Sequence, residues 1–109
     1  MYTANSPKEL KKLMKEDKFP ILVTDEKTIG IVEILESLKS KGILPTAKDE
    51  IKKALISIIS PTMNAVSGPI ILGIVTVSLA TIVALYALYK NKNVKWKVNP
   101  DGSIELSTN

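Results

Sequence analysis

The chain has 109 residues, 45% of them hydrophobic, and its 15 basic residues, all of them lysine, give a net charge of +4. It contains no cysteine and no histidine, which excludes disulfide bonds, thiolate catalysis, Cys/His metal centres and imidazole acid–base chemistry. The lack of arginine argues against nucleic-acid recognition, because bidentate contacts to guanine and phosphate favour the guanidinium group.

The first 25 residues predict a helix followed by a strand. Residues 6–9 (SPKE) form a capping box with proline at the first helical position, which predicts a helix that runs to about Asp17. Residues 19–24 are rich in β-prone side chains and predict a short strand. Pro20 cannot donate a ladder hydrogen bond, so it indicates an edge position or the beginning of the strand.

Two further helices are predicted before residue 61. Apolar residues recur at helical spacing over 25–40, and Gly42 follows as a stop signal. The segment from about Ala47 to Ser60 has an apolar face opposite a charged one, which is typical of an amphipathic helix. Two placements of this third helix stay open, against the first two helices or flat on a membrane surface.

The most conspicuous feature is an uncharged segment that covers residues 54–89. Within it, Ile70 to Tyr89 would extend roughly 30 Å as a helix, at about 1.5 Å per residue, which matches the hydrocarbon core of a bilayer. The sequence therefore predicts a transmembrane helix over 69–90. The alternatives are a two-arm membrane hairpin made from 54–89 and a buried central helix, which would need several partner helices to cover it.

Residues that flank and line the predicted span support two more specific predictions. Aromatic and lysine side chains gather at its C-terminal end, as at a membrane interface, and the predicted anchors are Tyr86, Tyr89, Lys90, Lys92 and Trp96. Small residues fall along one side of the span and predict a helix–helix interface made of Gly73, Thr76, Ala80, Ala84 and Ala87.

The C-terminal residues predict a β-hairpin. Apolar and polar residues alternate over 94–98 and again over 103–107, and the turn-forming residues Asn99-Pro100-Asp101-Gly102 lie between them. An isolated hairpin is marginally stable in water, so we expect it to dock on protein, to pair with a second copy or to lie against lipid headgroups.

Residue patterns for catalysis or cofactor binding are missing. The adjacent carboxylates at 25–26 and at 49–50 lie at predicted helix starts, where acidic residues stabilise the helix dipole. The five glycines are scattered, and no phosphate loop, nucleophile elbow or metal-ligand spacing occurs. We therefore expect no enzymatic activity, no cofactor, no metal, no small-molecule substrate and no nucleic-acid partner.

Taken together, the patterns predict an α+β protein with four parts: a helix-strand-helix-helix domain (1–60), a connector (61–68), one transmembrane α-helix (69–90) and a C-terminal β-hairpin (91–109). The leading functional hypothesis is a single-pass membrane protein that forms a homo-oligomer through its span and acts as an interaction or regulatory module. The expected partners are the lipid bilayer, a second copy and an unidentified protein.

Two other functions stay open. Assembled spans would permeabilise the membrane as a pore, holin or toxin does, with Thr76, Ser78 and Thr81 as the polar lining. Alternatively, the chain is a soluble adaptor whose apolar helix is a buried core element or inserts into a partner protein.

Overall fold

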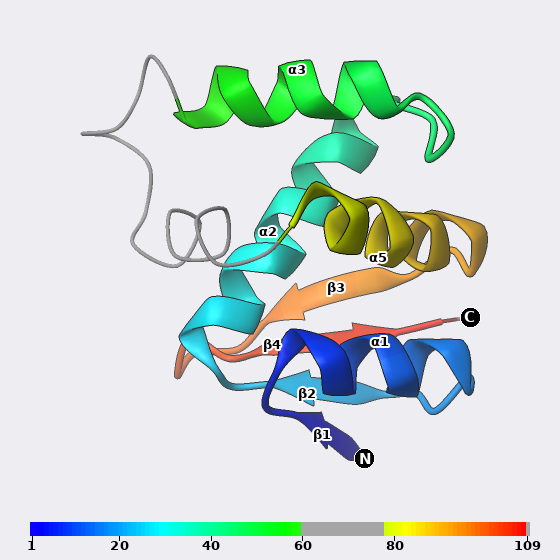
Figure 1. The fold of residues 1–109 in the computed structure, drawn as a ribbon. Helices are drawn as coiled ribbons and strands as arrows, with labels where there is room; N and C mark the ends of the chain where they lie inside the picture. The colour runs from blue at the N-terminus through cyan, green and yellow to red at the C-terminus, as the bar shows by residue number, and fades with distance from the viewer. Residues whose placement is uncertain (60–77, 109) are drawn as a thin grey trace.

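The computed structural model describes residues 1–59 and 78–108, which form a sheet with helices stacked on one of its faces (Figure 1). The elements in chain order are β1 (Tyr2–Ala4), α1 (Pro7–Lys15), β2 (Ile21–Val23), α2 (Glu26–Ser40), α3 (Lys48–Ile59), α5 (Leu79–Asn91), β3 (Lys95–Val98) and β4 (Ile104–Ser107). The four strands lie in the order β1-β2-β4-β3, so both ends of the chain contribute to the same sheet. The structure is α+β, as the sequence predicts.

The sheet mixes parallel and antiparallel pairs. β1 and β2 are parallel and are connected through α1, whereas β4 is antiparallel to both β2 and β3. Ile21 and Val23 lie opposite Leu106 and Ile104, and all four side chains are buried under the helices. The intervening position pairs the half-buried Leu22 with Glu105 on the face that carries no helix. This alternation explains why one face is apolar and the other largely polar.

Strand β1 is the element that the sequence analysis missed. Tyr2, Thr3 and Ala4 pair with Ile21, Leu22 and Val23, and only Ala4 is buried. Three residues with one buried side chain give no periodicity to recognise. The strand exists because β2 offers it a hydrogen-bonding edge from farther along the chain.

The predicted helix starts of α1 and α2 are confirmed by their caps. The Ser6 hydroxyl accepts a hydrogen bond from the Glu9 backbone N–H at 3.1 Å. At α2, Asp25 Oδ2 accepts from the backbone N–H of Thr28 at 3.0 Å and from its hydroxyl at 2.9 Å. Both side chains satisfy N–H groups that have no partner inside the helix.

Three helices end in the same way, with a residue in the left-handed region. These residues are Asp17 (φ 56°), Gly42 (φ 69°) and Asn93 (φ 52°). Each of these residues belongs to a Schellman motif. At the end of α5, for example, the N–H of Val94 donates to the carbonyl oxygen of Tyr89 at 3.1 Å. The sequence predicts only the glycine stop, because an aspartate or asparagine in this conformation gives a weaker sequence signal.

Helix α2 lies at the centre of the helical layer. Eight of its residues are buried, and it packs against α1, α3 and α5. Helix α3 buries Ile51, Ala54 and Leu55 in the same core. Of the two placements left open for this amphipathic helix, the structure has core packing.

The prediction of a transmembrane helix over 69–90 is wrong. None of the helices in the described part of the chain combines the length and the apolar character that crossing a bilayer requires. The described part of that range is α5, a helix of 13 residues whose start is capped by Ser78. The predicted single-pass membrane location, which depended on the span, is corrected with it, and so is the two-arm hairpin. Residues 69–77 lie outside the described residues.

Helix α5 is instead a component of the protein core. Its buried residues are Ile82, Leu85, Tyr86 and Tyr89, which follow helical spacing along one stripe. This stripe packs against α1, α2 and α3. The sequence analysis required several partner helices for a buried apolar helix, and three are present. Alanines and other small or half-buried residues make up much of the remaining surface of α5, so the helix is apolar all round without being buried all round.

We predict that Asn93 tolerates glycine but not alanine. Both residues have a Cβ, but the short polar side chain of asparagine can hydrogen-bond locally in the left-handed region and that of alanine cannot, so Asn93→Ala should lower the free energy of unfolding by about 1 kcal/mol. Asn93→Gly should leave it unchanged or raise it slightly. Urea unfolding measures both, with Asn91→Ala as the control in the last turn of the same helix. Equal effects of alanine at 91 and at 93 would contradict the prediction.

Candidate interaction surface

The tyrosines predicted to anchor the chain in a membrane interface are fully buried between helices. The Tyr86 hydroxyl donates a hydrogen bond to the carbonyl oxygen of Ile43, and the Tyr89 hydroxyl donates to Glu36 Oε2 on α2. Lys39 lies with its Nζ 5.6 Å from the centre of the Tyr89 ring and donates to the Val94 carbonyl at 3.0 Å. Each buried tyrosine therefore has a partner for its polar end, as burial demands.

Burial and Glu36 act together on these two phenols. Removal from water raises the pKa of Tyr89, and the hydrogen bond to Glu36 and the negative charge of that carboxylate raise it further. Burial, followed by the charge of Glu36, also raises the pKa of Tyr86. Both tyrosines therefore stay neutral and donate their hydrogen bonds in the folded protein.

The other predicted anchors lie at the surface. Lys90 is half-buried and its Nζ lies 3.4 Å from the carbonyl oxygen of Ile43, while Lys92 pairs with Asp17 at the ends of α5 and α1. Trp96 is on β3 and is 36% exposed. The predicted anchors therefore do not form one belt, because they belong to a helix, to its cap and to a strand.

The predicted small-residue interface lies only partly within the described residues. Ala80 is exposed, and Ala84 and Ala87 are half-buried on the side of α5 away from its buried stripe. Gly73 and Thr76 lie outside the described residues. With the span itself corrected, self-association through this face is no longer supported by a membrane argument.

The predicted hairpin is present, and its turn fixes the register of β3. Asn99 and Gly102 close a tight turn through a 3.0 Å hydrogen bond, and the N–H of Asn99 donates to Ser103 at 2.8 Å. Gly102 has a φ of 91°, which a glycine adopts without strain. Ser103 donates its hydroxyl and its backbone N–H to Asp101, and these hydrogen bonds lower the pKa of Asp101.

This register decides which backbone groups of β3 are free. Asn99 and Ser103 form a hydrogen-bonded pair, and such pairs alternate with non-hydrogen-bonded ones in an antiparallel ladder. Lys97 opposite Glu105 is therefore hydrogen-bonded, whereas Trp96 and Val98 direct their N–H and C=O groups away from β4. Among the described strands β3 has no neighbour on that side. We call this outward side of Lys95–Val98 the β3 edge.

Side chains of opposite character flank the β3 edge. Trp96 and Val98 share a face with the buried Leu106 and Ile104, yet they are 36% and 57% exposed. Lys95 and Lys97 lie on the face of the sheet that carries no helix. All four residues are exposed. The β3 edge thus combines unpaired backbone groups, an apolar side and a basic side.

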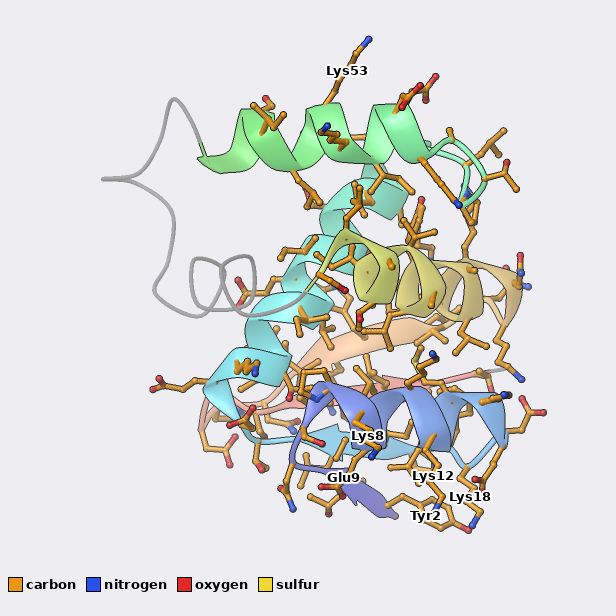
Figure 2. The ribbon with its side chains drawn as sticks, in the orientation of Figure 1. Tyr2, Lys8, Glu9, Lys12, Lys18 and Lys53 are labelled. Carbon is orange, nitrogen blue, oxygen red and sulfur yellow. The ribbon has the colours of Figure 1, made fainter. Side chains whose placement is uncertain are left out.

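The lysine-rich surface of α1 is a weaker candidate site. Lys8, Lys11, Lys12 and Lys15 are exposed along one side of the helix, and Figure 2 shows Lys8 and Lys12 there with Glu9 nearby. The shallow depression between them also includes Glu9 and Glu16. These carboxylates offset part of the positive charge, so we interpret this surface as a solvated helix face.

The described residues show no constellation for chemistry that the sequence overlooked. No three acidic side chains in the described part of the chain are arranged to hold a metal ion. A second depression, beside the hairpin turn, is lined by Glu26, Glu33, Asp101 and Ser103, and the Ser103 hydroxyl there donates to Asp101 as part of the turn itself. The expectations of no enzyme and no cofactor stay predictions.

No protein-family model, curated protein or solved structure matches the chain. The functional argument therefore depends on this chain's own residues. Sequence reasoning named Trp96 for its aromatic ring but missed that β3 is an edge strand. The alternation of Lys95, Trp96, Lys97 and Val98 contained part of that signal, since lysines are frequent on edge strands.

We predict that Tyr89 makes the protein sensitive to alkaline pH. Its pKa is raised in the folded state, so only the unfolded chain ionises just above the usual tyrosine pKa of about 10. The contribution of Tyr89 to the free energy of unfolding is therefore complete below pH 10. It is lost as the pH rises further, by up to about 1.4 kcal/mol per pH unit. Tyr89→Phe should reduce this slope, of which Tyr86 supplies another part, and should cost about 1–2 kcal/mol at neutral pH through the lost hydrogen bond.

Chemical unfolding measured from pH 7 to 11 tests this expectation, with Tyr2→Phe as the control because Tyr2 is exposed on β1. An unchanged alkaline slope in Tyr89→Phe would show that other groups govern the loss of stability.

We predict that hydrogen exchange distinguishes alternate amides of β3. The Lys97 N–H is paired with β4, whereas those of Trp96 and Val98 point away from the ladder. The two outward amides should exchange at least about tenfold faster than that of Lys97 in two-dimensional NMR spectra. Slow exchange at all three positions in the isolated protein would mean that the β3 edge is already covered.

Proposed function

We propose that this chain is a non-enzymatic interaction module, an adaptor that binds an extended segment of a partner protein as an additional strand on the β3 edge. The observation that carries the proposal is the outward direction of the Trp96 and Val98 backbone groups on an exposed outermost strand. Strand addition supplies main-chain hydrogen bonds for affinity and alternate side-chain contacts for specificity.

The way β3 is held supports this proposal. Its other side pairs with β4, and β4 pairs in turn with β2, so the strand belongs to a continuous sheet. Next to its first residue, Val94 is buried and its carbonyl accepts a hydrogen bond from Lys39 on α2. A strand that is already ordered loses little conformational entropy when a partner binds, which favours affinity.

The buried position of α5 favours this adaptor over the membrane hypotheses. The stripe from Ile82 to Tyr89 is used in the protein's own core. Ser78 and Thr81, two of the three residues suggested to line a pore, form the N-terminal cap of α5, with their hydroxyl oxygens 3.0 Å apart. Thr76, the third, lies outside the described residues.

We predict that proline at position 98 weakens partner binding strongly and leaves the fold intact. Val98→Pro removes an outward N–H, and no β3–β4 hydrogen bond uses that group. Val98→Thr keeps the N–H and the branched side chain, so it is the matched control. A displayed library of random twelve-residue peptides is enriched on the wild-type protein, and the enriched peptides are then titrated against each variant.

The expected result is at least about a tenfold loss of affinity for Val98→Pro and less than about a twofold change for Val98→Thr. Circular dichroism and thermal unfolding check that both variants fold. Peptides that bind Val98→Pro as tightly as the wild type would place the binding site elsewhere and overturn the proposal.

A further inference from the structure

The geometry points to the chemistry of the partner: we infer that the β3 edge selects an acidic extended segment in which carboxylate and apolar residues alternate. This inference rests on the proposed function, because it specifies which strand is added there. It follows from the register of the sheet, from the charges along β3 and from what a second copy of β3 would encounter.

A row of side chains crosses the face of the sheet that carries no helix. Thr3, Leu22, Glu105 and Lys97 occupy successive strands in register, and the position beyond Lys97 belongs to the added strand. Opposite charges directly across an antiparallel pair are stabilising. A partner carboxylate at that position would place Lys97 between two negative groups and would continue the alternation that Glu105 begins.

The opposite face of the added strand meets apolar side chains. Trp96 and Val98 are exposed there beside the buried Leu106 and Ile104. Because side chains alternate along a strand, partner residues opposite Trp96 and Val98 lie between the residues that meet Lys95 and Lys97. Apolar residues at those positions would cover the exposed indole and valine and would extend the core by one strand. The required pattern is therefore alternating acidic and apolar residues.

A second copy of β3 does not satisfy this pattern. Two copies paired antiparallel, with like faces together and at least three residues of each β3 in the pair, have a register centred on Trp96 or on Lys97. The first places Lys95 opposite Lys97, and the second places Lys97 opposite itself. Like charges directly across a strand pair are destabilising, so the lysines disfavour self-pairing while they favour an acidic partner.

The test uses the full chain and three eight-residue peptides with blocked ends, in which valine alternates with glutamate, with threonine or with lysine. Trp96 is the single tryptophan of the chain, so its fluorescence reports binding directly at the β3 edge. We expect the glutamate peptide to bind about tenfold tighter than the threonine peptide and the lysine peptide to bind weakest. The preference should decrease in 0.5 M salt, where charges are screened.

Charge reversal supplies the matched comparison. Lys97→Glu should weaken the glutamate peptide about tenfold and strengthen the lysine peptide, and Lys97→Gln should weaken the glutamate peptide about threefold. Lys53→Glu makes the same charge change on α3 and should leave the affinity unchanged. Figure 2 shows the Lys53 side chain pointing away from the sheet. Because Lys97→Glu faces Glu105, thermal unfolding checks that this variant folds, and Lys97→Gln tests the same contact without repulsion.

The outcomes separate this inference from the proposed function. Protection of the Trp96 and Val98 amides from exchange by the glutamate peptide, with loss of affinity at Lys97 but not at Lys53, supports both. Equal binding of the threonine and glutamate peptides, with the same protection, overturns the acidic preference and leaves strand addition standing. If no peptide protects these two amides, both fail. Equal losses of affinity for the glutamate peptide in Lys53→Glu and Lys97→Glu would show that the preference depends only on the net charge of the protein, which would overturn the inference.

Discussion

The burial of α2 is the constraint on which the rest of the structure depends. Eight of its fifteen residues are buried, and they occupy more of its circumference than one apolar stripe would. A helix of this kind must be covered from several sides. Helices α1, α3 and α5 provide much of that cover, and the apolar face of the sheet belongs to the same core. The apolar helix α5 is therefore needed inside the protein, as a cover for α2.

Two tyrosines of α5 are buried in this packing, and each has a hydrogen-bond partner for its hydroxyl group. Tyr86 and Tyr89 bury their rings between α5 and α2 and direct their hydroxyl groups to the Ile43 carbonyl and to Glu36. The same amphipathic character makes tyrosine frequent at membrane interfaces, where one end of the ring is dry and the other wet. A pair of tyrosines one turn apart is therefore compatible with either environment, and only the presence of Glu36 and Ile43 nearby distinguishes them.

The β3 edge follows from the order of the strands. Because β4 inserts between β2 and β3, the two ends of the chain share a sheet and β3 becomes its last strand on one side. Ile104 and Leu106 on β4 are buried, whereas Trp96 and Val98 opposite them on β3 are exposed. The lysines that alternate with them reduce pairing between copies, and the same charges give the edge a preference for carboxylates. The positive charge of these lysines therefore explains both the protection of the edge against self-pairing and its selectivity for an acidic partner.

Local features of this protein were determined by the sequence itself. The caps at Ser6 and Asp25, the stop at Gly42 and the turn at Asn99–Gly102 depend on residues within a few positions of one another, and the corresponding helices and hairpin are present as predicted. Long-range relations were decided only by the tertiary structure. Strand β1 depends on an edge offered by β2, and the burial of α5 depends on helices separated from it by many residues. An uncharged segment is compatible with lipid or with a protein core, because the hydrophobic effect does not specify what surrounds an apolar side chain. The same holds for Trp96, whose chemistry was evident in the sequence but whose place on a free edge depended on the strand order.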